Sequence, residues 1–213
     1  GWPLAALAAR SGDAQAAERF LQMVRGTRPN DNWRQIASAE AWLAENRGAL
    51  PGESKAPLPL ALCGRAQEKP YLDGKLDDPV WLSARPVELA SPRRDDGEWG
   101  ALAYLAHDDE FLYLAATCRR AAGFQYVESS IARPRDGDLS AQDRVEFVFD
   151  TDRDYSSYFR LSADHRGWPN DDCWGDRHWD PAWFVAVHHD EASWSIEAAI
   201  PLKELVPKPG DEQ

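Results

Sequence analysis

Two charged residues in the middle of predicted strands, Glu146 and Arg160, are the first candidates for chemistry. Glu146 lies in the apolar run Val-Glu-Phe-Val-Phe, and Arg160 lies in the later run Tyr-Phe-Arg-Leu. A carboxylate accepts hydrogen bonds in a bidentate way and a guanidinium donates from a planar fork. Side by side, the two groups match a sugar diol. The alternative is a cross-strand ion pair that only joins adjacent strands.

A second group of candidates is aromatic. Residues 165–180 carry three tryptophans, Trp168, Trp174 and Trp179, among aspartate, asparagine, arginine and histidine residues. Flat indoles mixed with polar side chains are typical of a carbohydrate surface, because large rings are costly to expose unless they pack or bind. The alternative is that one or two of these tryptophans hold the long loop in place. Trp183 begins a predicted strand and is expected in the core.

The third group could hold a hard cation. Asp150, Asp152 and Asp154 alternate with other residues, and alternating carboxylates are typical of an oxygen cage for structural Ca²⁺. The continuation of an EF-hand is missing, since Tyr155 stands where glycine is needed. The alternative is a solvated hairpin turn.

We expect β-strands to position these candidate residues. From residue 70 onward apolar residues recur with a period of two, which indicates strands. The pattern predicts three antiparallel hairpins, and a helical turn at 201–205. We therefore predict a mainly β protein, an antiparallel, jelly-roll-like β-sandwich preceded by a short helical segment. The hairpins pair 101–107 with 111–118, 144–149 with 155–162, and 183–188 with 194–200.

The N-terminal part has a different pattern. Residues 1–50 repeat apolar positions at three and four residues, which predicts short helices, either the end of a helical repeat or a cap. Residues 51–69 contain the proline, glycine and serine typical of a linker. Residues 70–213 form the predicted sandwich, expected to be truncated at its C-terminus.

Composition excludes several classes of function. A net charge of −12 argues against a nucleic-acid partner, and no apolar run is long enough to span a membrane. No signal segment follows Gly1, and we interpret the chain as a fragment of a larger protein. Cys63, Cys118 and Cys173 are too scattered for a metal framework. The apolar runs around Cys63 and Cys118 predict buried thiols, and a single disulfide stays open.

No motif for a catalyst stands out. The chain lacks a Gly-x-Ser-x-Gly elbow, a glycine-rich phosphate loop and a His-Glu-x-x-His helix. A glycosidase would need two carboxylates across a cleft, and with 36 acidic residues some pair meets that condition by chance. We therefore expect the fragment itself not to be an enzyme, although its parent protein could be one.

Two phrases in the β region resemble a known family. The first is Asp73-Gly74-Lys75-Leu76-Asp77-Asp78-Pro79-Val80-Trp81, and the second is Gln142-Asp143-Arg144-Val145-Glu146, a strand that ends in Asp150. With the hairpin at 101–118 and the run Trp-Ser-Ile-Glu-Ala-Ala-Ile-Pro at 194–201, they resemble the family 9 carbohydrate-binding modules over residues 70–206. Haem and sugar modules of the DOMON type share this sandwich.

The resemblance implies which residues bind. In the family a glutamate matching Glu146 bonds sugar hydroxyls, and an arginine matching Arg160 lies on the neighbouring strand. The family also holds a terminal sugar between two tryptophans and often holds structural calcium. The stretch 138–141, where one of those tryptophans would lie, has no aromatic residue. Haem is not expected, because the usual methionine ligand has one candidate, Met23, in the helical segment.

From these observations we expect a non-catalytic carbohydrate-binding accessory module of a larger secreted or cell-envelope protein. Its expected partners are a carbohydrate and the other domains of the same parent chain. The alternative is a structural or interaction sandwich with no sugar ligand, and a catalytic domain acting on glycans is a third interpretation.

Overall fold

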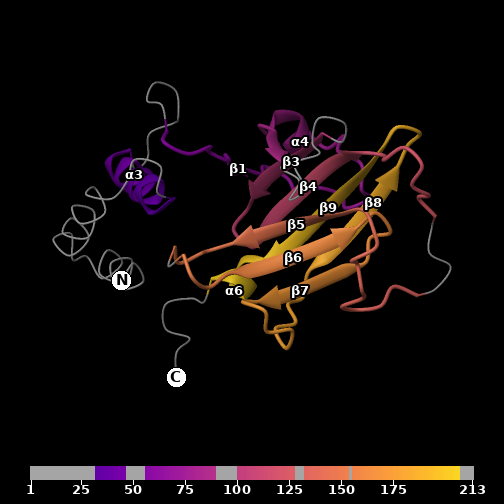
Figure 1. Ribbon diagram of the computed structural model, residues 1–213. Coiled ribbons are helices and arrows are strands. Elements are labelled where there is room, and N and C mark those ends of the chain that lie inside the picture. The colour runs from indigo at the N-terminus through magenta and orange to yellow at the C-terminus, as the bar shows by residue number, and fades with distance from the viewer. Residues whose placement is uncertain (1–31, 47–55, 90–99, 128–131, 154, 207–213) are drawn as a thin grey trace. The chain divides into compact units, whose positions relative to one another are not determined.

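The computed structural model describes residues 32–46, 56–89, 100–127, 132–153 and 155–206 (Figure 1). The predicted helices before Asn30 lie outside these ranges. The chain divides into two compact units, one of Gly1–Leu60 with Asp152–Ser157 and one of Ala61–Thr151 with Tyr158–Gln213. The division after Leu60 falls inside the predicted linker at 51–69.

The first unit contains the helix α3 (Asn32–Glu45), where a helix was predicted. Its buried residue Ala37 is 4% exposed. Within the same unit, Glu40 on α3 meets the segment Asp152–Ser157. Tyr155 Oη donates a hydrogen bond to Glu40, and Arg153 Nη2 lies 3.3 Å from the same carboxylate.

The second unit is built on two β-sheets, as predicted. The larger sheet has the strand order β1-β3-β4-β9-β8, with β2 also paired to β3. The predicted hairpins of β3 with β4 and of β8 with β9 are confirmed, and both are antiparallel. The Asp108 carboxylate closes the first turn by accepting the N–H groups of Glu110 and Phe111, each at 2.7 Å. The strands of this sheet are β1 (Gly64–Arg65), β2 (Val87–Leu89), β3 (Ala101–His107), β4 (Phe111–Arg119), β8 (Phe184–His189) and β9 (Ser193–Pro201).

The smaller sheet consists of β5 (Arg144–Phe149), β6 (Phe159–Asp164) and β7 (Pro169–Cys173), in that order and all antiparallel. In Figure 1 its three strands lie in front of the larger sheet. Short helices flank the strands, α4 (Pro79–Ser83) before β2 and α6 (Leu202–Leu205) after β9.

The main core lies between the two sheets, which makes the unit a β-sandwich. Alternate residues of β4 and β9 face alternate residues of β5 and β6 across it, because successive side chains of a strand point to opposite faces. Its fully buried members include Leu114, Leu161, Trp194, Ile196 and Ile200. The predicted core position of Trp183 is confirmed, since this residue is 9% exposed.

The other face of the larger sheet is covered by the opening segment, residues 70–84. Trp81, 3% exposed, packs there in a second cluster with Ala106, Tyr113 and Ala199. Its indole Nε1 donates a 2.6 Å hydrogen bond to Glu197, which is fully buried on β9. The same carboxylate accepts the backbone N–H groups of Gly74 at 2.7 Å and Asp73 at 3.0 Å.

Gly74 is required at this position for two reasons. Its φ is +86°, a region that L side chains rarely adopt, and a Cβ there would lie 2.3 Å from the backbone carbon of Val187. At Asp73-Gly74 the backbone of the opening segment therefore approaches the sheet closely.

Several expectations were wrong in detail. β6 begins at Phe159 rather than Tyr155, and residues 155–157 belong to the unit that contains α3. Part of the predicted loop at 165–180 is the strand β7. Cys63 is exposed, although its apolar neighbours predicted burial, whereas Cys118 is buried; all three cysteines are free. In the part of the chain that the structure describes, no helix has the length and apolarity needed to cross a membrane.

Candidate functional site

The outer face of the smaller sheet carries the polar side chains that its strands direct away from the core. Directly opposite residues of antiparallel strands share a face, and two of the resulting rows contain the candidate residues. Glu146 lies opposite Ser162, which lies opposite Asn170. The next row is Val148, Arg160 and Asp172. Glu146 and Arg160 therefore lie on one face, in neighbouring rows, as the sequence predicted.

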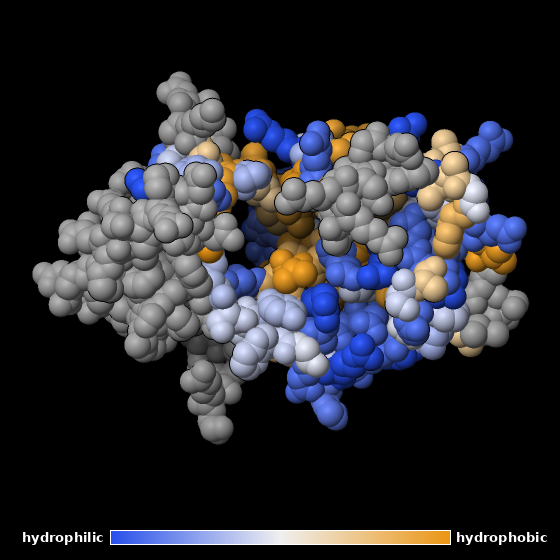
Figure 2. All heavy atoms as spheres, viewed as in Figure 1, coloured by the Kyte–Doolittle hydropathy of each residue, from blue (hydrophilic) through white to orange (hydrophobic). Residues whose placement is uncertain are grey.

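A hollow with a volume of about 320 Å³ opens over these rows. The segment 136–140, which precedes β5, forms one wall, and Arg177, from the loop after β7, contributes to the lining. Figure 2 shows hydrophilic residues gathered over β6 and β7 on this side of the molecule. The lining residues are Asp136, Gly137, Asp138, Leu139, Ser140, Arg144, Glu146, Arg160, Ser162, Asn170 and Arg177.

Glu146 is exposed and held from its own strand. Arg144 Nε donates a 2.8 Å hydrogen bond to Glu146 Oε1, and Arg144 Nη1 donates to the carbonyl oxygen of Leu139 at 3.2 Å. Arg144 thus connects the carboxylate to the wall of the hollow. The side chain of Glu146 remains 39% exposed, so it can accept further hydrogen bonds from a ligand.

Arg160 is held from the neighbouring strand by Asp172. Arg160 Nε and Nη2 lie 2.6 Å and 2.5 Å from Asp172 Oδ2, and the N–H of Gly175 donates to Asp172 Oδ1 at 2.7 Å. The hydrogen bond to Asp172 is the chief cause that raises the pKa of Arg160, so the guanidinium keeps its charge. The side chain of Asp172 is only 3% exposed, whereas that of Arg160 is 37% exposed.

The cross-strand ion pair between Glu146 and Arg160, which was the alternative interpretation of the sequence, is replaced by two separate pairs. Glu146 is paired along β5 with Arg144, and Arg160 is paired across to β7 with Asp172. The physical reason is register, because the two residues are diagonal rather than directly opposite. Each partner fixes one group and leaves part of it facing the hollow.

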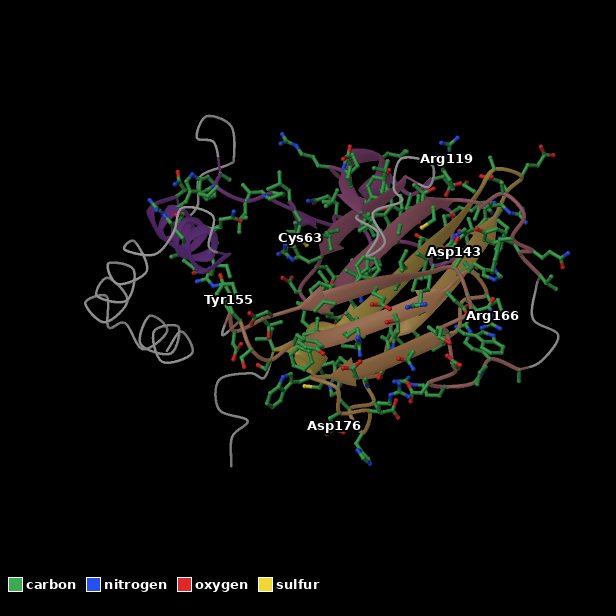
Figure 3. The ribbon with its side chains drawn as sticks, viewed as in Figure 1. Cys63, Arg119, Asp143, Tyr155, Arg166 and Asp176 are labelled. Atoms are coloured by element: carbon green, nitrogen blue, oxygen red, sulfur yellow. The ribbon has the colours of Figure 1, made fainter. Side chains whose placement is uncertain are left out.

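Trp168 supports the wall of the hollow from outside the lining. A Cβ on Gly137 would lie 3.1 Å from the Trp168 ring, so the wall rests on the indole. The guanidinium of Arg166 also stacks on this indole, 3.7 Å from a ring centroid, and Asp164 holds that guanidinium with hydrogen bonds of 2.9 Å and 2.5 Å. In Figure 3, Arg166 and Asp143 lie toward the same end of the smaller sheet.

The other two predicted tryptophans lie elsewhere. Trp174 is 66% exposed with φ of +52°, and its backbone N–H donates to the carbonyl oxygen of Tyr158 at 2.7 Å. Trp179 is half-buried, and its ring centroid lies 4.9 Å from that of Phe159. None of the three tryptophans lines the hollow. Their contact with a ligand stays a prediction.

The predicted calcium ligands are only partly described. Asp154 lies outside the described residues, so the set Asp150, Asp152 and Asp154 is not tested by the structure. Among the residues that are described, no group of three or more histidine, cysteine, aspartate or glutamate side chains is arranged to hold a metal ion. Calcium binding stays a prediction, and a fall in melting temperature on chelation would be its test.

Some residues of the hollow were missed by the sequence analysis. Arg144 could have been found, because it lies two positions before Glu146 and therefore on the same face of the predicted strand. Ser162 follows Arg160 by the same spacing. Asn170 and Arg177 lie in the predicted loop at 165–180 but were not singled out there. Pro-Asn-Asp-Asp-Cys has the composition of a loop rather than of a strand, so the face on which Asn170 lies could not be predicted.

Comparisons with known proteins concern the fold. No protein-family model and no curated protein matches the chain. The chain is similar to a family 9 carbohydrate-binding module from Caldicellulosiruptor kristjanssonii in complex with cellotriose, at 18% identity and a TM-score of 0.44, covering 67% of each chain. It is also similar to a family 9 module from that organism in complex with glucose, at 16% identity and a TM-score of 0.40, covering 70% of this chain and 69% of the other. These modules belong to the family that the sequence motifs resemble.

Proposed function

We propose that the second unit is a non-catalytic carbohydrate-binding module that holds a sugar in the hollow over β5, β6 and β7. The observation that carries the proposal is the lining itself. It combines carboxylates, guanidinium groups, a hydroxyl and an amide within about 320 Å³, near the lower limit of about 300 Å³ for small-molecule pockets.

A sugar hydroxyl both donates and accepts, so a sugar site must offer both kinds of partner. Glu146 accepts hydrogen bonds, Arg160 donates them, and Asn170 does both. Arg144 and Asp172 hold the two charged groups in place with bonds of 2.8 Å and 2.6 Å. A side chain that is already held loses less conformational freedom when a ligand binds. This arrangement supports binding rather than a purely structural role.

The acidic lining residues support a non-catalytic role. A glycosidase needs one carboxyl group with a raised pKa to act as the general acid. The pKa of Asp138 is instead lowered, chiefly because its carboxylate accepts the backbone N–H of Ser140. Asp136 accepts the N–H of Asp171 at 3.4 Å, and Glu146 is paired with Arg144. All three carboxylates are arranged to accept hydrogen bonds from fixed donors.

Within this proposal, the unit serves as an accessory module of a larger secreted or cell-envelope protein, next to other domains of the same parent chain. The size of the hollow suits the end or a single unit of a glycan. The competing proposal is a sandwich that only joins neighbouring domains or partner proteins and has no sugar ligand.

Isothermal titration calorimetry of the chain with a panel of mono- and oligosaccharides tests the proposal. Glucose and cellotriose belong in that panel, together with galactose, mannose and xylose series. We expect saturable heat with at least one series, and an affinity at least about tenfold lower for Glu146→Ala and for Arg160→Ala, since each loses charge-assisted hydrogen bonds.

Asp109→Ala is the matched control. Asp109 is an exposed carboxylate whose partner, Arg65, lies 2.7 Å away on the larger sheet, so its removal should leave sugar affinity unchanged. Absence of heat across the panel, with the protein folded by circular dichroism, would contradict sugar binding and favour the joining role.

A further inference from the structure

The charged residues that line the hollow differ in whether they already have a hydrogen-bond or ion-pair partner within the protein. Three are basic, Arg144, Arg160 and Arg177, and three are acidic, Asp136, Asp138 and Glu146. Arg144 donates to Glu146, and Arg160 donates to Asp172. Asp138 accepts the N–H of Ser140 at 2.9 Å, and Asp136 accepts the N–H of Asp171. Five of the six therefore have a partner inside the protein.

Arg177 is the exception. It is exposed in the loop after β7, and within the described residues its guanidinium makes no hydrogen bond or ion pair. The pKa of Asp138 is lowered chiefly by its hydrogen bonds with Ser140, and the charge of Arg177 contributes less. In Figure 3, Asp176, the residue before it, lies on the loop beside the end of β7. The five donors of this guanidinium are thus free for a ligand in the hollow.

The described lining of the hollow also lacks the flat surface on which a neutral sugar gains affinity by stacking. No aromatic side chain belongs to that lining, since Trp168 lies behind Gly137, Trp179 packs on Phe159 and the exposed Trp174 lies outside it. Affinity at this site must therefore come mainly from hydrogen bonds and charge. A ligand that brings its own carboxylate would form a bidentate pair with a free arginine, the strongest polar contact that such a site can offer.

We propose that the hollow selects an acidic sugar, a uronic acid residue, and that Arg177 is the specificity-determining residue that binds its carboxylate. This inference rests on the proposed sugar-binding function. Glu146 and Arg160 bind ring hydroxyls, and Arg177 pairs with the carboxylate from the loop after β7. A cationic amino sugar fits less well, since each acidic group of the lining already has a partner in the protein, whereas Arg177 has none within the described residues.

Matched ligands test the inference. Methyl glycosides of glucose, galactose and mannose are each compared with the corresponding uronate and with its uncharged methyl ester, by calorimetry on the whole chain. The ester keeps the ring and its hydroxyls, and it replaces the charged carboxylate by an uncharged group that is larger by one methyl. We expect at least one uronate to bind about tenfold more tightly than its own ester.

Matched variants assign that preference to a residue. Arg177→Gln should bring the ratio of uronate to ester affinity close to one, and Arg177→Lys, which keeps the charge without the fork, should retain part of it. Arg119→Gln is the control, because Arg119 is also an exposed arginine and lies on β4, in the other sheet (Figure 3). It changes the net charge equally and should keep the full preference.

The outcomes separate this inference from the proposed function. If neutral sugars bind and uronates bind no better than their esters, the acidic selectivity is wrong and sugar binding stands. A uronate preference that survives Arg177→Gln would overturn the role of Arg177. If no ligand binds the folded wild-type chain, the proposed function and this inference fall together.

Discussion

Two glutamates in the middle of strands, Glu197 on β9 and Glu146 on β5, point away from the same core in opposite directions. Glu197 is fully buried under the opening segment, where it accepts hydrogen bonds from Trp81, Gly74 and Asp73. The side chain of Glu146 is 39% exposed and is paired with Arg144. In sequence both residues lie at an outward position within an apolar run.

The difference shows that the role of a carboxylate that points away from the core depends on whether another segment covers that face of the sheet. A buried carboxylate is stable only when donors replace its water, and three donors from the opening segment do so for Glu197. It therefore attaches a segment that lies more than a hundred residues earlier in the chain. Within the described ranges no segment buries Glu146, so its remaining hydrogen-bonding capacity is available to a ligand.

Removing the buried carboxylate should have the largest effect. Glu197→Ala leaves the Trp81 indole and two backbone N–H groups buried without an acceptor, and we expect the free energy of unfolding to fall by about 3 kcal/mol. Urea denaturation followed by tryptophan fluorescence measures it. Glu146→Ala is the matched control and should change stability by less than about 0.5 kcal/mol. Equal losses of stability in the two variants would contradict the difference between the covered and the open carboxylate.

A smaller effect is expected from changing Asp172, a buried carboxylate that holds Arg160 on the open face of the smaller sheet. Asp172→Asn keeps an oxygen for the N–H of Gly175 but replaces the charged partner of Arg160, which then loses its fixed orientation. We expect sugar affinity to fall about tenfold with only a modest loss of stability, because charge-assisted bonds are roughly twice as strong as neutral ones.

The control for the Asp172 experiment is Asp190→Asn, in the turn between β8 and β9. The Asp190 carboxylate also accepts backbone N–H groups, from Ala192 at 2.7 Å and Ser193 at 2.6 Å, but it belongs to the larger sheet. This variant should leave sugar affinity unchanged. If Asp172→Asn leaves sugar affinity unchanged, Arg160 does not need the Asp172 carboxylate to hold its orientation.

The smallest effect concerns pH. Burial raises the pKa of Glu197 above its ordinary value of 4.5, although the hydrogen bonds from Trp81, Gly74 and Asp73 oppose the rise. The folded state then binds this proton more tightly than the unfolded state. Its stabilising contribution is complete below the ordinary pKa of 4.5 and is lost as the pH rises through the raised pKa.

Urea denaturation of the wild type and of Glu197→Gln across the range from about pH 4 to about pH 7 checks this sign. We expect the stability of the wild type to decline relative to that of the variant as the pH rises, because glutamine does not titrate. If the stability of the wild type instead rises relative to that of the variant, the hydrogen-bond donors lower the pKa of Glu197 more than burial raises it.

Much of the sandwich could be predicted from local pattern. The hairpins of β3 with β4 and of β8 with β9 follow from a period of two and acidic turns, and Asp108 closes the first turn within its own neighbourhood. Glu146 and Arg160 could be placed on one face from their strands alone. β7 could not be predicted, since its ladder to β6 compensates for residues that disfavour strands.

By itself the sequence determined where strands and turns form and which side chains leave the core, because these depend on spacing along the chain. Only the tertiary structure decided that Glu197 is covered and Glu146 open, that Asp172 orients Arg160, and that Trp168 supports a wall rather than lining the hollow. Those outcomes depend on contacts between segments distant in sequence, and local spacing carries no information about which segment covers which face.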